Sequence, residues 1–201
     1  ATILGYEGVI SLLDIINGEP MKFFALAPSL MPPLPVIDSK PLIGHKELEK
    51  IIARPDIVGL GETIWPYVID EDPYVMGMVD IAGKYNKEVE GHSAGAKGSK
   101  LVAYVASGIS SCHEPIKIDE LLARLRLGIY VMIREGSIRR DLEALSQIKD
   151  LNIDYRRLIL VSDGVDAYDL LNLGYMEYIV QKAINLGINP IKAIQMATLN
   201  V

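Results

Sequence analysis

Five apolar segments of this sequence each lead directly into side chains that could do acid–base or metal chemistry. In Leu158–Gly164 (LILVSDG), four apolar residues run into a serine, an aspartate and a glycine. A carboxylate at the tip of a buried strand is costly unless it is paired or bound to a metal. The residues at the five ends are Glu62, His92, His113 with Glu114, Arg134 with Glu135, and Asp163.

Two imidazoles and two carboxylates in this set match the ligands of a hydrolytic divalent-metal site. They belong to Glu62, His92, His113 and Asp163, and nitrogen and oxygen donors of this kind are typical of such sites. A bound cation would compensate the charge of Asp163 and lower the pKa of a bound water toward ~7. The recurrence of these residues at strand ends therefore favours a metal site.

Each of these residues also has an ordinary structural interpretation. Glu62 or Asp163 could cap the following helix, and Arg134 with Glu135 could form an ion pair. A histidine after a strand is often only hydrogen-bonded. Trp65, three residues after Glu62, could stack on a planar ring or pack in a loop.

The composition narrows the classes of partner. The 201 residues carry 26 Asp and Glu against 20 Lys and Arg, a net charge of -6, so a nucleic acid is not an expected partner. No apolar run reaches the roughly 18 residues of a membrane span. The one cysteine, Cys112, excludes an intrachain disulfide and favours a reducing, cytoplasmic location. We interpret it as a packed thiol, with zinc ligation as the alternative.

Strand-like and helical segments alternate along residues 1–201, which predicts one α/β domain with a mainly parallel sheet. The predicted strands are 21–27, 57–60, 88–92, 108–112, 129–133 and 158–162. The predicted helices include 7–17, 45–53, 100–107, 119–128, 141–148 and about 169–186, with two more starting at Asp72-Pro73 and Asn189-Pro190. Six strands suit a doubly wound sheet, and an eight-stranded barrel needs two more. Polar residues at five strand tips favour the barrel, because all its carboxyl ends surround one cavity.

Six motifs give the sequence a specific resemblance. They are GLGE (59–62), GHSAG (91–95), CHE (112–114), LRLGIYVMIREGS (125–137), VSDG (161–164) and IQMATLN (194–200). In order and spacing they resemble the bacterial and archaeal adenine deaminases of the amidohydrolase superfamily, over essentially the whole chain. The resemblance implies a (β/α)8 barrel of the TIM type, incomplete here, with about strands 3 to 8 present.

The resemblance also implies a site with two divalent metals, manganese or iron, that deaminates the small molecule adenine to hypoxanthine. In that site Glu62 would bridge the metals, His92 and His113 would be ligands, and Asp163 would contact metal and shuttle a proton. Glu114 would protonate or hydrogen-bond the purine. Arg134 and Glu135 are further expected substrate-binding residues, with Trp65 as a stacking candidate.

The sequence departs from the family pattern in its first two strands, which are missing, and at Cys112, where the family usually has an aspartate. The His-x-His pair of the family's first strand is absent, and both ends of the chain look like cuts through a longer protein, although processing would also explain the first. Two alternatives therefore stay open: an amidohydrolase of another ring compound, or a non-catalytic piece that binds metal weakly. Missing strands would expose sheet edges, which invite association, so a homo-oligomer is compatible with the sequence.

Overall fold

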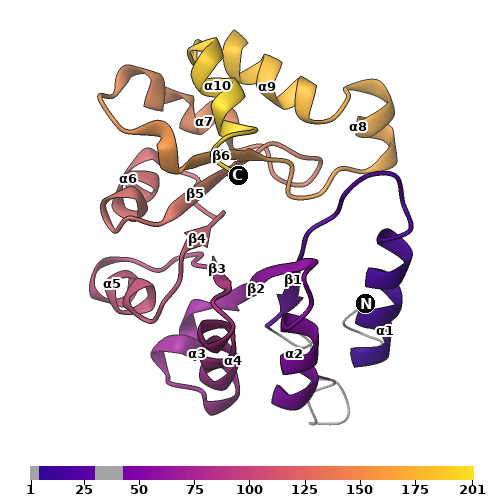
Figure 1. The fold of residues 1–201 in the computed structure, drawn as a ribbon. Helices are drawn as coiled ribbons and strands as arrows, with labels where there is room; N and C mark the ends of the chain where they lie inside the picture. The colour runs from indigo at the N-terminus through magenta and orange to yellow at the C-terminus, as the bar shows by residue number, and fades with distance from the viewer. Residues whose placement is uncertain (1–4, 30–42) are drawn as a thin grey trace. The chain divides into compact units, whose positions relative to one another are not determined.

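The computed structural model describes residues 5–29 and 43–201, along which helices and strands alternate (Figure 1). These residues form two compact units. The first unit consists of the described residues up to His92 together with Gly98–Ser110. The second consists of Ser93–Lys97 and Ser111–Val201.

The first unit is built on three parallel strands: β1 (Ala25–Pro28), β2 (Ile57–Ile64) and β3 (Glu88–His92). β2 pairs with both of the others. The helices described here are α1 (Gly5–Ile16), α2 (His45–Ile52), α3 (Trp65–Ile69), α4 (Pro73–Lys84) and α5 (Gly98–Ala106). Because β2 and β3 run parallel, their carboxyl ends lie at the same edge of the sheet. The chain between them therefore has to cross over, as parallel pairs require.

Helix α4 is the crossover between β2 and β3, and its start is defined locally by the sequence. The Asp72 carboxylate accepts hydrogen bonds from the backbone N–H groups of Tyr74 and Val75, both at 3.0 Å. Pro73 occupies the first turn, where its missing N–H has no cost. The helix buries the predicted apolar stripe, Val75, Met78, Val79 and Ala82.

The second unit repeats the alternation with β4 (Ser111–Cys112), β5 (Tyr130–Arg134) and β6 (Leu158–Val161). β5 pairs in parallel with β4 and with β6. The helices are α6 (Ile118–Arg126), α7 (Leu142–Leu145), α8 (Ala167–Asn172), α9 (Met176–Asn185) and α10 (Pro190–Met196), with 3-10 turns η2 (Ser146–Asp150) and η3 (Tyr155–Arg157).

The core of the second unit explains one of the sequence motifs. Its buried residues come from β5, β6 and the surrounding helices, among them Val131, Leu160 and Met196. Asn200, the last residue of IQMATLN, donates its side-chain amide to the carbonyl oxygens of Tyr155 and Leu158, at 2.7 and 2.8 Å. This asparagine therefore attaches the end of the chain to the start of β6.

The predicted elements are found in the predicted order, but several bounds differ. The strands expected over 21–27 and 108–112 are shorter, at Ala25–Pro28 and Ser111–Cys112, and the helix expected over 141–148 is α7 followed by the 3-10 turn η2. Strand β2 continues to Ile64, so Glu62 lies within the strand rather than after it. Helix α3 follows it directly, where the sequence indicated a loop. The helix expected over about 169–186 was wrong as one element, because Gly174 adopts a φ of +100° between α8 and α9.

The prediction of an α/β fold with six parallel strands is confirmed over the described residues. Within each unit the strands follow chain order, β1-β2-β3 in the first and β4-β5-β6 in the second, and helices alternate with them. None of the helices in the described ranges combines the length and apolar character needed to cross a membrane. The assignment of residues 1–201 to one domain stays a prediction.

Replacing Asn200 with alanine should lower the free energy of unfolding by about 1–3 kcal/mol, because two partly buried carbonyl groups lose their donor. Urea denaturation followed by circular dichroism measures this. Asn172→Ala is the matched control, since its amide donates to the Tyr168 carbonyl on an exposed helix, and should change stability by less than about 0.5 kcal/mol. Equal effects of the two substitutions would contradict the attachment.

Candidate functional site

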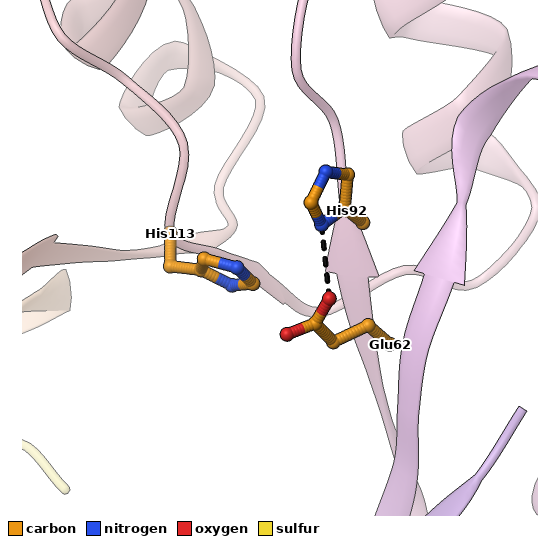
Figure 2. A group of neighbouring side chains, drawn as sticks. All are labelled: Glu62, His92 and His113. Atoms are coloured by element: carbon orange, nitrogen blue, oxygen red, sulfur yellow. Dashed lines mark hydrogen bonds and ion pairs between the residues drawn. The ribbon is translucent and has the colours of Figure 1, made fainter. Parts of the chain in front are cut away.

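Glu62 and His92 lie side by side at the carboxyl ends of two neighbouring strands of the first unit. Figure 2 shows the imidazole of His92 directed at the carboxylate of Glu62, with Nδ1 3.0 Å from Oε2. The side chain of His92 is 33% exposed and that of Glu62 is 50% exposed, so both are accessible to solvent. A carboxylate oxygen and an imidazole nitrogen at this spacing could ligate a metal ion.

The backbone of this pair is held by polar groups of the same unit. Ser29, which directly follows β1 and is fully buried, donates its hydroxyl to the carbonyl oxygen of Glu62. The hydroxyl of Tyr104, on α5, accepts a hydrogen bond from the His92 N–H at 2.9 Å and donates to the carbonyl oxygen of Thr63. The two candidate ligands are therefore fixed through their main chain.

His113 and Glu114 follow β4 in the second unit and are almost fully buried, at 6% and 8% exposure. Their side chains are in contact, with His113 Nε2 3.2 Å from Glu114 Oε1. The other oxygen of Glu114 accepts from Ser93, both from its N–H at 2.8 Å and from its hydroxyl at 2.9 Å. Glu114 is therefore a fixed acceptor beside the imidazole, as in carboxylate–histidine pairs that orient metal ligands.

Ser93 is in turn held by a buried arginine that the sequence did not single out. Arg124, on α6 and 2% exposed, donates from Nε to the Ser93 hydroxyl at 3.0 Å and from Nη2 to the Ser93 carbonyl at 2.8 Å. Since an arginine has five donors in a rigid fork, it can fix both groups at once.

Asp163 lies two residues after β6 and is held by Arg134, the last residue of β5. Arg134 Nη1 donates to Asp163 Oδ2 at 3.2 Å, while its Nε and Nη2 both contact Asp141 Oδ2 at 2.8 Å. The Arg134 side chain is 8% exposed and that of Asp163 is 34% exposed. The carboxylate of Asp163 thus keeps access to solvent on a backbone with a φ of +50°.

Glu135 and Trp65, the other two predicted substrate-binding residues, also have partners within their own units. The Glu135 carboxylate accepts from Lys182 Nζ at 2.7 Å and is buried. Trp65 begins α3, and Lys100 Nζ lies 5.4 Å from the centre of its ring. The substrate-binding role of both residues stays a prediction.

Cys112 precedes His113 and is fully buried. Burial, reinforced by the negative charge of Glu114, raises the pKa of its thiol to about 12. The thiol is therefore protonated at neutral pH, which agrees with a packed side chain.

The fold and these residues describe an α/β protein with carboxylates and imidazoles at the carboxyl ends of parallel strands, an arrangement frequent in α/β enzymes. No family model matches the chain. Over its whole length it is 38% identical to an adenine deaminase of Archaeoglobus fulgidus, 39% to one of Moorella thermoacetica and 38% to one of Methanocaldococcus jannaschii. The chain spans about a third of the length of these relatives: 35%, 34% and 35%. The resemblance predicted from the motifs is thus confirmed over the whole chain.

Alkylation of Cys112 at about pH 8 should be slow in the native protein and fast after unfolding. A pKa near 12 in place of the ordinary 9.0 lowers the thiolate fraction about a thousandfold, and burial blocks access as well. Mass spectrometry after iodoacetamide treatment, with and without urea, measures the difference, and the single cysteine makes the result unambiguous. Rapid modification of the folded protein would contradict a buried, protonated thiol.

Proposed function

We propose that the protein containing this chain hydrolyses adenine to hypoxanthine and ammonia with the help of bound divalent metal. The observation that carries the proposal is identity of 36–39% over essentially the whole chain to proteins named adenine deaminase. Several residues of these motifs lie at or near strand ends. The side chains of Glu62, His92 and Asp163 are accessible to solvent, and that of Glu114 is oriented by hydrogen bonds from Ser93.

The donor set fits a divalent metal. Glu62 and His92 offer an oxygen and a nitrogen 3.0 Å apart on accessible side chains, and such donors suit manganese, iron or zinc. We propose that His113 and Asp163, at the ends of β4 and β6, complete the ligand set. By resemblance to the family, the metal would be manganese or iron, with two ions per site. When bound, a divalent cation lowers the pKa of water toward ~7 and so makes hydroxide available at neutral pH.

Asp163 is the proposed proton carrier of the reaction. Its partly exposed carboxylate would take a proton from the attacking water and return it to the amino group that leaves C6 of adenine as ammonia. Arg134 donates to one carboxylate oxygen, which leaves the other oxygen available for proton transfer. Adenine and water then give hypoxanthine and ammonia with no net change in protons.

Glu114 is proposed to protonate or hydrogen-bond the purine ring. Its fixed position beside His113 supports this role, because Ser93 already orients one carboxylate oxygen with two donors. Arg134, Glu135 and Trp65 are proposed to contact adenine at the rim of the site. In this structure the first two carry ion-pair partners, so adenine would have to compete with or share those contacts.

The remaining features of the proposal concern setting and partners. A small neutral substrate suits a chain with a net charge of -6, which disfavours nucleic acid. A buried, protonated Cys112 thiol is compatible with the cytoplasm, the compartment proposed here for a purine-salvage hydrolase. A homo-oligomer is compatible with the fold, and we include it in the proposal as a partner of the same chain.

Asp163→Asn should reduce the turnover of adenine by about 10²–10⁴-fold, because the amide cannot carry the proton. The full protein, purified with manganese, is assayed for ammonia release. Asp166→Asn is the matched control: Asp166 caps α8 through the Asp169 N–H, and asparagine caps equally well, so activity should be retained. Unchanged activity of Asp163→Asn would contradict the role, and ammonia release only from another ring compound would contradict adenine as substrate.

Removing metal with a chelator should abolish activity, and adding manganese or iron(II) should restore it. His92→Ala should lower the metal content of the protein as measured by elemental analysis. His45→Ala is the control histidine, since His45 lies on α2, where its Nε2 is 2.8 Å from the Tyr74 carbonyl oxygen, and it should leave the metal content unchanged. Full metal content in His92→Ala would exclude this residue as a ligand.

A further inference from the structure

The hydroxyl of Tyr104 joins β2 and β3 at the point where both candidate ligands of the first unit emerge. Tyr104 lies on α5 with its side chain fully buried. Its oxygen accepts the N–H of His92 at 2.9 Å and donates to the carbonyl of Thr63, the residue after Glu62. The Tyr104 hydroxyl therefore contacts the main chain of His92 and the main chain of the residue next to Glu62.

The pairing of β2 and β3 is irregular at this same point. Leu60 lies opposite Val89, whereas Thr63 lies opposite Gly91, so β2 contains one more residue than β3 in this interval. An extra residue of this kind disrupts the ladder and redirects side chains, as β-bulges near active sites commonly do. The extra residue falls in the interval that contains Glu62, so the direction of that carboxylate depends on how the irregularity is held.

We propose that Tyr104 is a positioning residue: its hydroxyl fixes the irregular segment of β2 against the end of β3, and thereby keeps the Glu62 carboxylate and the His92 imidazole in position to share a ligand. This inference rests on the proposed function, because the shared ligand is the divalent metal. Ser29 holds the Glu62 carbonyl from the β1 side, and Tyr104 provides the corresponding contact on the β3 side.

Tyr104→Phe separates the hydroxyl from the packing of the ring. The substitution keeps nearly all of the side-chain volume, but it removes the acceptor of the His92 N–H and the donor to the Thr63 carbonyl. Groups that orient metal ligands typically contribute 10–100-fold to metal affinity. The irregular segment should then shift, and the two ligands should lose their alignment.

Tyr74→Phe is the matched control in the same unit. The Tyr74 hydroxyl also donates to a main-chain carbonyl, that of Ile43, at 2.7 Å, but this bond joins α4 to the residue before the N-cap of α2 and involves no residue of β2 or β3. If Tyr104 only stabilised the fold, the two phenylalanine variants would behave alike in every measurement except the unfolding midpoint.

The test uses the full protein freed of metal and titrated with Co²⁺, whose visible absorption reports the ligand geometry. Wild type and Tyr74→Phe should bind with the same affinity and spectrum, whereas Tyr104→Phe should bind 10–100-fold more weakly with an altered spectrum. Placing 4-aminophenylalanine at position 104 restores an N–H donor to the Thr63 carbonyl and should rescue part of the binding. Wild-type affinity in Tyr104→Phe, or failure of the rescue, would overturn the proposal.

A second measurement needs no metal. In the metal-free protein, amide hydrogen exchange of His92 should accelerate at least tenfold in Tyr104→Phe and stay unchanged in Tyr74→Phe. Unchanged exchange of the His92 amide in Tyr104→Phe would also overturn the proposal. If wild type neither bound Co²⁺ nor released ammonia, the proposed function would fail, while the exchange experiment would still decide the role of Tyr104.

Discussion

The contact between the Glu62 carboxylate and the His92 imidazole is the interaction on which the chemistry proposed for the first unit depends (Figure 2). Two such groups stay close only if the strands that carry them run parallel and end at the same edge, which the crossover through α4 enforces. Side chains this exposed are well solvated, so their contact adds little to the stability of the fold. A site of this kind is therefore better explained by function than by folding.

Periodicity predicted most of the fold because the elements are locally determined. Strands 88–92 and 158–162 and the helix starting at Asp72-Pro73 follow from apolar runs and capping residues alone, and the structure places them within one residue. The break at Gly174 was missed because apolar residues continue at helical spacing on both sides of it. A glycine with positive φ ends a helix through backbone freedom, which a hydrophobic pattern does not reveal.

The candidate site was predictable only for residues whose types carry chemistry. Imidazoles and carboxylates that recur at the ends of several strands indicate a site as a set, so Glu62, His92, His113 and Asp163 could be selected. The groups that hold these side chains could not. Tyr104 and Arg124 are buried helix residues, and only the three-dimensional structure shows that Tyr104 hydrogen-bonds the main chain of His92 and that Arg124 holds Ser93.

In each unit a buried helix side chain holds the main chain next to a candidate site residue. The buried residues are Leu101 and Tyr104 in α5, and Leu121 and Arg124 in α6. In each helix a side chain that ends in a polar group thus follows a buried leucine by three residues. The leucine is part of the buried core, and the polar side chain hydrogen-bonds the main chain next to a candidate site residue. Because a buried hydroxyl or guanidinium is destabilising without partners, the position of each polar group is strongly restrained. A polar side chain on the buried stripe of a crossover helix is thus a sequence feature that indicates how an α/β site is supported.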